Sequence, residues 1–410
     1  MQWQTIKARF VSLWGDSSVK TAVSLYLILR ILLTVWAVVA LRINPLPEEP
    51  DGLLRPYFDQ PILDDGIAGL LLGPWQRFDT MHYTRIAAQG YATERDSVFP
   101  PLYPLGIRVF GELFGGSHAA YMLAAILISN AACLGLFIVV YRLVADEFDE
   151  SLSTRTLIYL GLFPVGFYLM APYSESLFIL LAITSVWAAS KDKFVWAGVL
   201  GLLASLTRLT GWVLIVPLAY EFWRRYLGYG SWKIEPISWY RRNITALIMV
   251  GFPPLGTVLF IVYRWLVGLP SLPTIYAEYW YQTTGFPGVD MLTALNTMFL
   301  GGSARAGEFT LWFDFFVTLL LIGTTIHAFF RFNRPTWGLY SGLLLLFILL
   351  PTSEVKPLYS FSRYTLAFVP TFMLMAEYGR NPIVHRIILY VSLALYLYFS
   401  GQFVVWGWVA

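Results

Sequence analysis

Charged residues are scarce in this chain of 410 residues. Asp, Glu, Lys and Arg together make up 13% of it, against roughly 25% in a typical soluble domain. The formal net charge is only +3 at pH 7 and the charges are dispersed, so nothing indicates nucleic-acid binding. The single cysteine, Cys133, excludes an intramolecular disulfide, and a total of four histidines offers few metal ligands.

Several sequence motifs are also absent. There is no Walker loop, dinucleotide fingerprint or nucleophile elbow, so ATP and NAD chemistry lack support. No internal repeat, low-complexity tail or soluble domain is evident, and we expect residues 1–410 to form a single membrane-embedded domain. The first apolar stretch is followed by Arg42, Ile43 and Asn44 rather than by small residues, so we expect no cleavable signal peptide.

Long apolar runs dominate the chain instead. Hydrophobic residues make up 57% and aromatic residues 17%, and the mean hydropathy is +0.62. A transmembrane helix needs about 20 largely apolar residues, and about eleven segments are candidates. They lie near residues 20–41, 119–144, 156–171, 174–190, 194–208, 210–223, 243–267, 309–330, 336–351, 364–379 and 387–409. The four between 156 and 223 are short and could instead be broken or re-entrant helices. The fold class predicted from this pattern is an all-α polytopic membrane protein.

The basic residues predict the orientation. With a cytoplasmic N-terminus, most Lys and Arg fall on the inner side, which is the positive-inside pattern. The inner set is Lys7, Arg9, Lys20, Arg142, Arg155, Lys191, Lys193, Arg224, Arg225, Lys233, Arg241, Arg242, Arg331, Arg334, Arg380 and Arg386. Two long loops, residues 42–118 and 268–308, are then extracytoplasmic, since long loops cross the membrane largely regardless of their charge.

The first of these loops contains a polar cluster from Gln76 to Tyr83. The pattern predicts a short amphipathic helix from Asp79 to Gln89, with Gly90 as its C-terminal stop. Residues 99–104, Phe-Pro-Pro-Leu-Tyr-Pro, are expected to form a rigid extended corner rather than a helix. Residues 105–114 would then lie in the interface plane.

This orientation brings further polar groups to the same outer side. Asp79 and His82 are three residues apart, hence on one helical face. Tyr173, Ser174 and Glu175 are expected in a tight turn between spans, Thr207 and Arg208 at the end of another, and Lys356, Arg363 and Tyr364 beside a later one. Carboxylates, a histidine and arginines around a cavity at membrane level suggest handling of a phosphate and a hydroxyl, because an arginine fork suits phosphate.

Each of these residues also has a simpler interpretation. Asp79 could simply cap a helix, since Asp is favoured at that position, and His82 is more often a structural or substrate-contacting side chain than a metal ligand. Glu175 is equally well read as a solvated turn residue. Arg208 and Arg363 could do no more than extend to lipid headgroups. The run of residues 276–281 is as consistent with an interfacial helix as with a ligand-binding wall.

The motifs resemble those of a known family. The first-loop block contains Arg77-Phe78-Asp79, His82-Tyr83, Ile86-Ala87 and Gly90-Tyr91, followed by Phe99-Pro100-Pro101-Leu102-Tyr103-Pro104. Three shorter pieces follow in the same order: Pro172-Tyr173-Ser174-Glu175-Ser176, Thr207-Arg208 with Gly211, and Ser362-Arg363-Tyr364. Together they resemble the signature of the PIG-V (GPI mannosyltransferase 2) family. Phe78 stands where the family usually has Trp, and Pro101 departs from its commoner Phe-Pro order, which suggests a distant, prokaryotic member.

The resemblance implies a GT-C type glycosyltransferase, a helical membrane enzyme. Such enzymes take mannose or a similar hexose from a polyprenyl (dolichyl) phosphate donor on the non-cytoplasmic side. The acceptor would be a lipid or a glycan, with no nucleic acid involved, and the membrane would be the plasma membrane in a prokaryote or the ER membrane in a eukaryote. Matching the motif assigns the essential acidic residue to Asp79. The candidate substrate-binding residues are Arg77, His82, Tyr83, Tyr103, Tyr173, Glu175, Arg208, Lys356, Arg363 and Tyr364.

These assignments are compatible with the expected chemistry. Asp79 would accept the proton of the acceptor hydroxyl, Arg208 or Arg363 would stabilise the departing phosphate, and a one-step displacement would invert the anomeric centre. His82 and Tyr83 would position the substrates. The scheme requires no cofactor and is also compatible with a bound divalent metal ion. The alternatives are a transporter or flippase for lipid-linked sugars, an oligosaccharide ligase or phospholipid-modifying transferase, and a non-catalytic scaffold.

Overall fold

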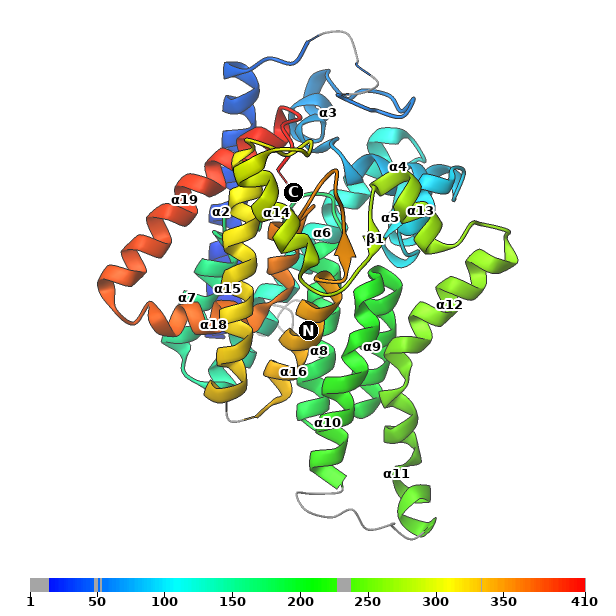
Figure 1. Cartoon of the computed structure of the whole chain (residues 1–410), viewed down its shortest axis with the longest axis vertical. Helices are drawn as coiled ribbons and strands as arrows, with labels where there is room; N and C mark the ends of the chain where they lie inside the picture. Colours follow the sequence, from blue (N-terminus) through cyan, green and yellow to red (C-terminus); the bar gives the residue numbers. More distant parts are fainter. Residues whose placement is uncertain (1–14, 48–50, 52–53, 227–236, 333, 410) are drawn as a thin grey trace, which may run out of the picture.

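The structure, a computed structural model, is helical and describes residues 15–47, 51, 54–226, 237–332 and 334–409 (Figure 1). In this part of the chain, four helices are long and apolar enough to cross a membrane. They are α2 (Ser17–Ile43), α6 (His118–Glu147), α15 (Phe309–Arg331) and α19 (Pro382–Val404). A bent pair, α11 (Ile237–Val250) and α12 (Phe252–Leu266), with a 48° break, raises the number to five if it counts as one span. The prediction of a helical, multi-pass membrane protein is confirmed, whereas the count of about eleven spans is not.

The other predicted spans contain shorter helices. These are α7 (Glu150–Gly161), α8 (Glu175–Ser190), α9 (Phe194–Thr207), α10 (Ile215–Tyr226), α16 (Thr336–Ile348) and α18 (Val369–Tyr378). Short 3-10 turns accompany them: η3 (Gly166–Leu169), η4 (Leu209–Leu214) and η5 (Thr365–Ala367). Each of the six helices is shorter than the roughly 20 residues of a complete span.

One of these segments corrects a prediction. The helix expected over residues 156–171 ends at Gly161, because Pro164 cannot continue it and disfavours a helical residue before it. The chain then runs through a buried link, residues 162–174, before α8 begins at Glu175. Tyr173 and Glu175 therefore do not occupy a tight turn between two spans; they lie at the end of this link and at the start of α8.

Both predicted outer loops are folded and lie at the same end of the helical bundle (Figure 1). The first contains α3 (Gly66–Leu71), η1 (Gly73–Trp75), α4 (Asp79–Gln89), η2 (Glu94–Val98) and α5 (Leu102–Leu113). The second contains α13 (Leu272–Trp280), β1 (Thr283–Thr284) and α14 (Val289–Leu300). Strand β2 (Pro351–Thr352) pairs antiparallel with β1, and the short helix α17 (Phe361–Tyr364) follows it. The chain thus gathers its non-spanning elements beside one another.

The local predictions for the first loop are partly confirmed. Helix α4 has the expected bounds, and Gly90 ends it with a positive φ of 75°. The extended corner over residues 99–104 is wrong in its second half, because α5 begins at Leu102 and includes Tyr103 and Pro104. Proline is accepted in the first turn of a helix, where its missing N–H has no intrahelical partner in any case.

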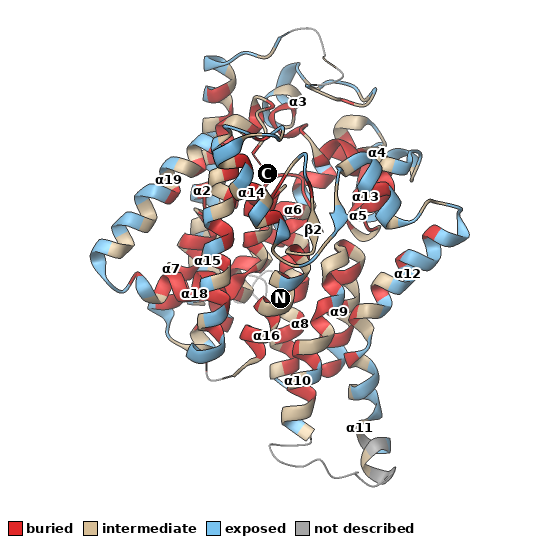
Figure 2. Cartoon of the chain, in the orientation of Figure 1, coloured by how far each residue is buried: buried red, intermediate tan, exposed pale blue. Residues whose placement is uncertain are grey.

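The outer faces of several long helices are apolar and exposed (Figure 2). On α2, for example, Ile28, Ile31 and Val35 are exposed, and on α19 Ile383 and Ile387 are. A monomer in water rarely exposes so much contiguous apolar surface. Helices of this kind, hydrophobic outside as well as inside, are those of a protein surrounded by lipid.

Candidate active site

A cavity of about 650 Å³ lies where the two outer loops meet the helices. Asp79 and Tyr83 of α4 line it, together with Arg208 at the end of α9 and Arg363 and Tyr364 of α17. Aromatic and apolar side chains complete the wall: Val98, Phe99, Leu209, Leu272, Tyr276, Trp280, Phe347, Ile348, Leu350 and Tyr359. The cavity therefore brings together charged groups that are far apart in the sequence and surrounds them with rings and aliphatic surface.

Asp79 is the carboxylate of α4 that faces this cavity. Its Oδ2 accepts a hydrogen bond from Nη1 of Arg363 at 2.6 Å, and its backbone N–H donates to the hydroxyl oxygen of Tyr173 at 3.2 Å. The N-cap of α4 is Phe78, and no side chain caps this helix end. The simpler interpretation of Asp79 as a helix cap is thus wrong: its carboxylate binds an arginine instead.

Glu175 forms a second carboxylate–arginine contact next to the first. Its Oε1 lies 2.6 Å from Nη1 of Arg208 and 3.3 Å from Nε of Arg363. The Glu175 side chain is only 4% exposed, so it is not a solvated turn residue. Arg208 and Arg363 likewise form ion pairs inside the protein rather than extending to headgroups. Arg363 consequently lies between two carboxylates, Asp79 and Glu175.

This environment keeps Arg363 charged. Burial acts to lower its pKa, but the carboxylates of Asp79 and Glu175 outweigh that effect and hold the pKa of the Arg363 guanidinium well above its ordinary value. The guanidinium also lies 5.5 Å from the ring centre of Tyr173, within cation–π range. A permanently charged guanidinium in a cavity wall is suited to bind an anionic ligand.

Two residues not singled out from the sequence as site residues support Arg363 from behind. The first N–H groups of α17 include that of Ser362, which donates to Oδ1 of Asp314 at 2.8 Å. Asp314 is paired through Oδ2 with Nη2 of Arg305 at 2.9 Å, and Arg305 also donates to the carbonyl oxygen of Pro357 at 2.8 Å. The signal available in the sequence was Asp314 itself, an acidic residue inside a predicted span.

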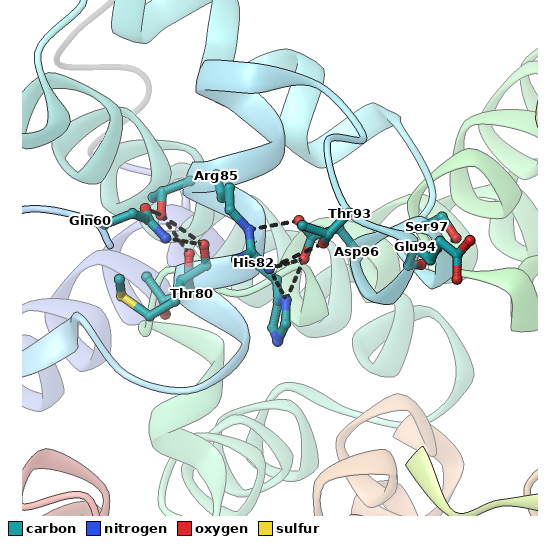
Figure 3. Close-up of polar contacts among 10 residues, drawn as sticks. Gln60, Thr80, His82, Arg85, Thr93, Glu94, Asp96 and Ser97 are labelled. Carbon is teal, nitrogen blue, oxygen red and sulfur yellow. Dashed lines mark hydrogen bonds and ion pairs between the residues drawn. The ribbon is translucent and has the colours of Figure 1, made fainter. Parts of the chain in front are cut away.

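His82 belongs to a buried polar network beside the cavity (Figure 3). Its Nδ1 lies 2.5 Å from Oδ1 of Asp96, and Arg85 donates to both oxygens of Asp96 at 2.7 Å. Burial acts to raise the pKa of Asp96, yet the bonds from His82 and Arg85 hold it below its ordinary value. The His82 ring stacks on Phe99, a cavity residue, at 5.1 Å. His82 does not itself line the cavity, so it supports the wall from outside.

The remaining candidates divide into wall and support. Tyr83 and Tyr364 line the cavity, and the Tyr83 hydroxyl is 2.8 Å from Oγ of Ser174. Tyr103 and Tyr173 are buried behind the wall, where the Tyr103 hydroxyl lies 2.7 Å from Oγ of Ser129.

Arg77 and Lys356 are placed differently from the others. Arg77 is buried away from the cavity, and its Nε donates to the carbonyl oxygen of Val404 at 2.8 Å. The Lys356 ammonium group lies at the edge of the cavity, 5.0 Å from the ring centre of Tyr359. Among the described residues, no group of three or more His, Cys, Asp or Glu side chains could hold a metal ion.

The fold and the cavity define a helical membrane protein with paired carboxylates and arginines facing an aromatic-lined space. Its sequence identifies the family: the chain belongs to the mannosyltransferase (PIG-V) family, whose model matches residues 19–225. This membership confirms the family and the glycosyltransferase class predicted from the motifs. It favours an enzyme over the transporter and scaffold alternatives.

Curated relatives are named GPI mannosyltransferase 2. The one from Cryptococcus neoformans var. neoformans is 28% identical over 161 residues, which cover 37% of this chain and 38% of the relative. The one from Chaetomium globosum is 29% identical over 152 residues, covering 34% of this chain and 31% of the relative. The matched part thus spans less than half the length of either relative. Among solved structures, the chain is similar to the oligosaccharyltransferase of Archaeoglobus fulgidus, with 12% identity, a TM-score of 0.44, and coverage of 92% of this chain and 53% of that one.

Proposed function

We propose that this protein transfers mannose from a polyprenyl-phosphate donor to a hydroxyl of a lipid or glycan acceptor, as a GT-C type inverting enzyme. The observation that carries the proposal is the contact of 2.6 Å between the Asp79 carboxylate and the Arg363 guanidinium in the wall of one cavity. A proton acceptor and a phosphate-binding group are the two parts that transfer from a phosphate-linked sugar needs. Both lie in a chain that belongs to a mannosyltransferase family.

The walls of the cavity match the three parts of such a donor. Arg208 and Arg363 provide guanidinium groups for the phosphate. Tyr276 and Trp280 offer ring faces of the kind that pack against a sugar. The apolar side chains that would accommodate the first isoprene units are Leu209, Phe347, Ile348 and Leu350.

The reaction follows from these positions. Asp79 accepts the proton of the acceptor hydroxyl as its oxygen attacks the anomeric carbon, and the bond from that carbon to the phosphate oxygen breaks on the opposite face. The phosphate leaves as an anion that Arg208 and Arg363 stabilise. A β-linked donor therefore gives an α-linked product. The scheme uses no metal ion.

The ion pair between Asp79 and Arg363 predicts the order in which donor and acceptor bind. While Arg363 holds Asp79, the carboxylate oxygen that would take the proton is engaged. The phosphodiester of the donor is an anion with two non-bridging oxygens, so it can replace the Asp79 carboxylate on the Arg363 guanidinium, which binds phosphate bidentately. Donor binding thus releases Asp79 for the acceptor hydroxyl, and the donor binds first.

The test is transfer by the purified chain in nanodiscs. Radiolabelled polyprenyl-phosphate mannose is supplied with a panel of lipid and glycan acceptors, and the product is digested with an α-mannosidase. We expect mannose in an acceptor fraction and its release by that enzyme. Absence of transfer to every acceptor, or a product resistant to the α-mannosidase, would contradict the proposal.

We also propose that the N-terminus is cytoplasmic and that the site lies on the extracytoplasmic side of the membrane. Cys133 is the only cysteine and is buried, so an introduced cysteine can be labelled selectively. Ala92 is exposed in the loop between α4 and η2. We expect Ala92→Cys to react with a membrane-impermeant maleimide in intact cells, and labelling only after lysis would place the loop inside.

A further inference from the structure

Two positively charged side chains at the edge of the cavity are not used by the proposed donor site. Arg95 belongs to η2, and Lys356 follows β2. Neither forms an ion pair with a carboxylate of the described residues, in contrast to Arg208 and Arg363. Cations near a membrane-level cavity that lack a counter-ion are unusual, because partly desolvated charges are normally paired.

Each of the two cations lies against an aromatic side chain of the cavity wall. The Arg95 guanidinium is 5.5 Å from the ring centre of Trp280, and the Lys356 ammonium is 5.0 Å from that of Tyr359. Trp280 and Tyr359 both line the cavity. The Lys356 ammonium is also 5.7 Å from the ring centre of Tyr281, which directly follows Trp280 in the chain. Burial lowers the pKa of Lys356, and the Arg95 charge lowers it further. They therefore belong to one region of the cavity edge, which we call the rim.

The rim contains several hydrogen-bond donors without acceptors. Nε of Arg95, Nε1 of Trp280 and Nε1 of Trp408 are buried and have no partner within the described part of the chain. Trp408 stacks on Tyr359 at 4.6 Å and lies 6.0 Å from the Lys356 ammonium. The carboxylate whose charge acts on Lys356, Glu308, is already paired with Arg305 at 3.0 Å. Unpaired donors are costly unless a ligand satisfies them, and here the ligand must supply acceptor oxygens.

We propose that Arg95 and Lys356, with the indole N–H groups of Trp280 and Trp408, form a second anion subsite that binds a phosphate group of the acceptor. Phosphate fits this set because it offers several acceptor oxygens and charge at one point. The assignment to the acceptor rests on the proposed function, in which Arg208 and Arg363 already bind the donor phosphate. The protein would thus select acceptors that carry a phosphate near the hydroxyl to be mannosylated.

The subsite is tested by binding two short-chain probes to the detergent-solubilised full chain. Dioctanoyl phosphatidic acid represents a phosphate-bearing acceptor lipid, and geranyl phosphate represents the polyprenyl-phosphate part of the donor. We expect the double variant Arg95→Gln, Lys356→Gln to weaken phosphatidic acid binding by at least about tenfold and to leave geranyl phosphate binding unchanged. Arg208→Gln should do the reverse. A charge-matched control, Arg108→Gln with Lys20→Gln, removes two exposed cations elsewhere and should change neither affinity.

The outcomes separate the subsite from the donor site. Wild-type affinity for phosphatidic acid in the Arg95 and Lys356 double variant would overturn the subsite, and so would equal losses for both probes. Failure of the proposed donor site would give a different result. The affinity for geranyl phosphate would then be unchanged in Arg208→Gln, while the double variant would still lose affinity for phosphatidic acid. Melting temperatures of all variants in the same detergent identify any loss that is due to unfolding. In that case the single variant Arg95→Gln, which changes only one side chain, replaces the double variant.

Discussion

Replacing Asp79 by asparagine isolates the role proposed for its carboxylate. Asparagine has the same shape, and its amide oxygen can still accept the hydrogen bond that Arg363 Nη1 now donates to Oδ2 at 2.6 Å. It cannot accept the proton of an acceptor hydroxyl. General base catalysis contributes about 10²–10⁴-fold, so we expect kcat to fall by that factor, which corresponds to about 3–5 kcal/mol in the activation free energy.

The same structure predicts what the variant should not lose. Arg363 keeps its contact of 3.3 Å with Glu175, so the guanidinium is not left without a counter-charge and the fold should persist. Its attraction to a donor phosphate should increase, because the neighbouring negative charge of Asp79 is gone. We therefore expect Asp79→Asn to bind geranyl phosphate at least as tightly as the wild type while transfer collapses.

The assay combines single-turnover transfer of radiolabelled mannose with equilibrium binding of geranyl phosphate and a melting curve. The matched control is Glu221→Gln, because Glu221 is also buried and paired with an arginine, Arg224, at 2.7 Å, but does not line the cavity. It should lose stability without losing the chemical step. A transfer rate for Asp79→Asn close to that of the wild type would remove Asp79 from the mechanism.

Three further predictions concern the donor site, the binding order and the network around His82. Arg208→Ala should raise the KM for the donor by about tenfold or more, because it removes one charged contact to the phosphate; an unchanged KM would refute the phosphate role. Donor should bind before acceptor, so product-inhibition patterns should be those of an ordered mechanism, and random-order patterns would contradict the release of Asp79 by the donor. The depressed pKa of Asp96 means that its stabilisation is present above the ordinary pKa of 3.8 and is lost as pH falls through the lower folded value. The melting temperature should therefore fall more steeply in the wild type than in Asp96→Asn once the pH drops below about 4, and parallel curves would exclude this contribution.

The parts of the fold that depend on local signals were predictable from the sequence. Helix α4 has its expected bounds because an amphipathic pattern and a terminal glycine are both encoded within a few residues. The end of α9 at Thr207 was equally clear. The predictions for residues 99–104 and 156–171 failed because the effect of a proline depends on its position relative to a helix. Pro104 lies inside the first turn of α5, which tolerates it, whereas Pro164 follows the end of α7 at Gly161.

The site was predictable as a set of residues but not as a geometry. Asp79, Glu175, Arg208 and Arg363 were all candidates, yet nothing local shows that Arg363 lies between the two carboxylates, since that depends on how α4, α8 and α17 pack. Residues that work through a partner were missed. Asp96 is an example, because a lone acidic residue in a polar loop carries no pattern until His82 and Arg85 are found beside it.

The position of Arg363 along the chain has a consequence for the exchange of segments between relatives. The family match covers residues 19–225 and so includes Asp79, Glu175 and Arg208, but the guanidinium that joins the two carboxylates comes from residue 363. A chimera built at the edge of the matched region would inherit the carboxylates from one parent and their shared counter-charge from the other. Its site would be complete only where the second parent also supplies an arginine there, together with the Arg305–Asp314 pair that holds α17 in place. The part of the sequence that matches the family model therefore does not contain the whole candidate site.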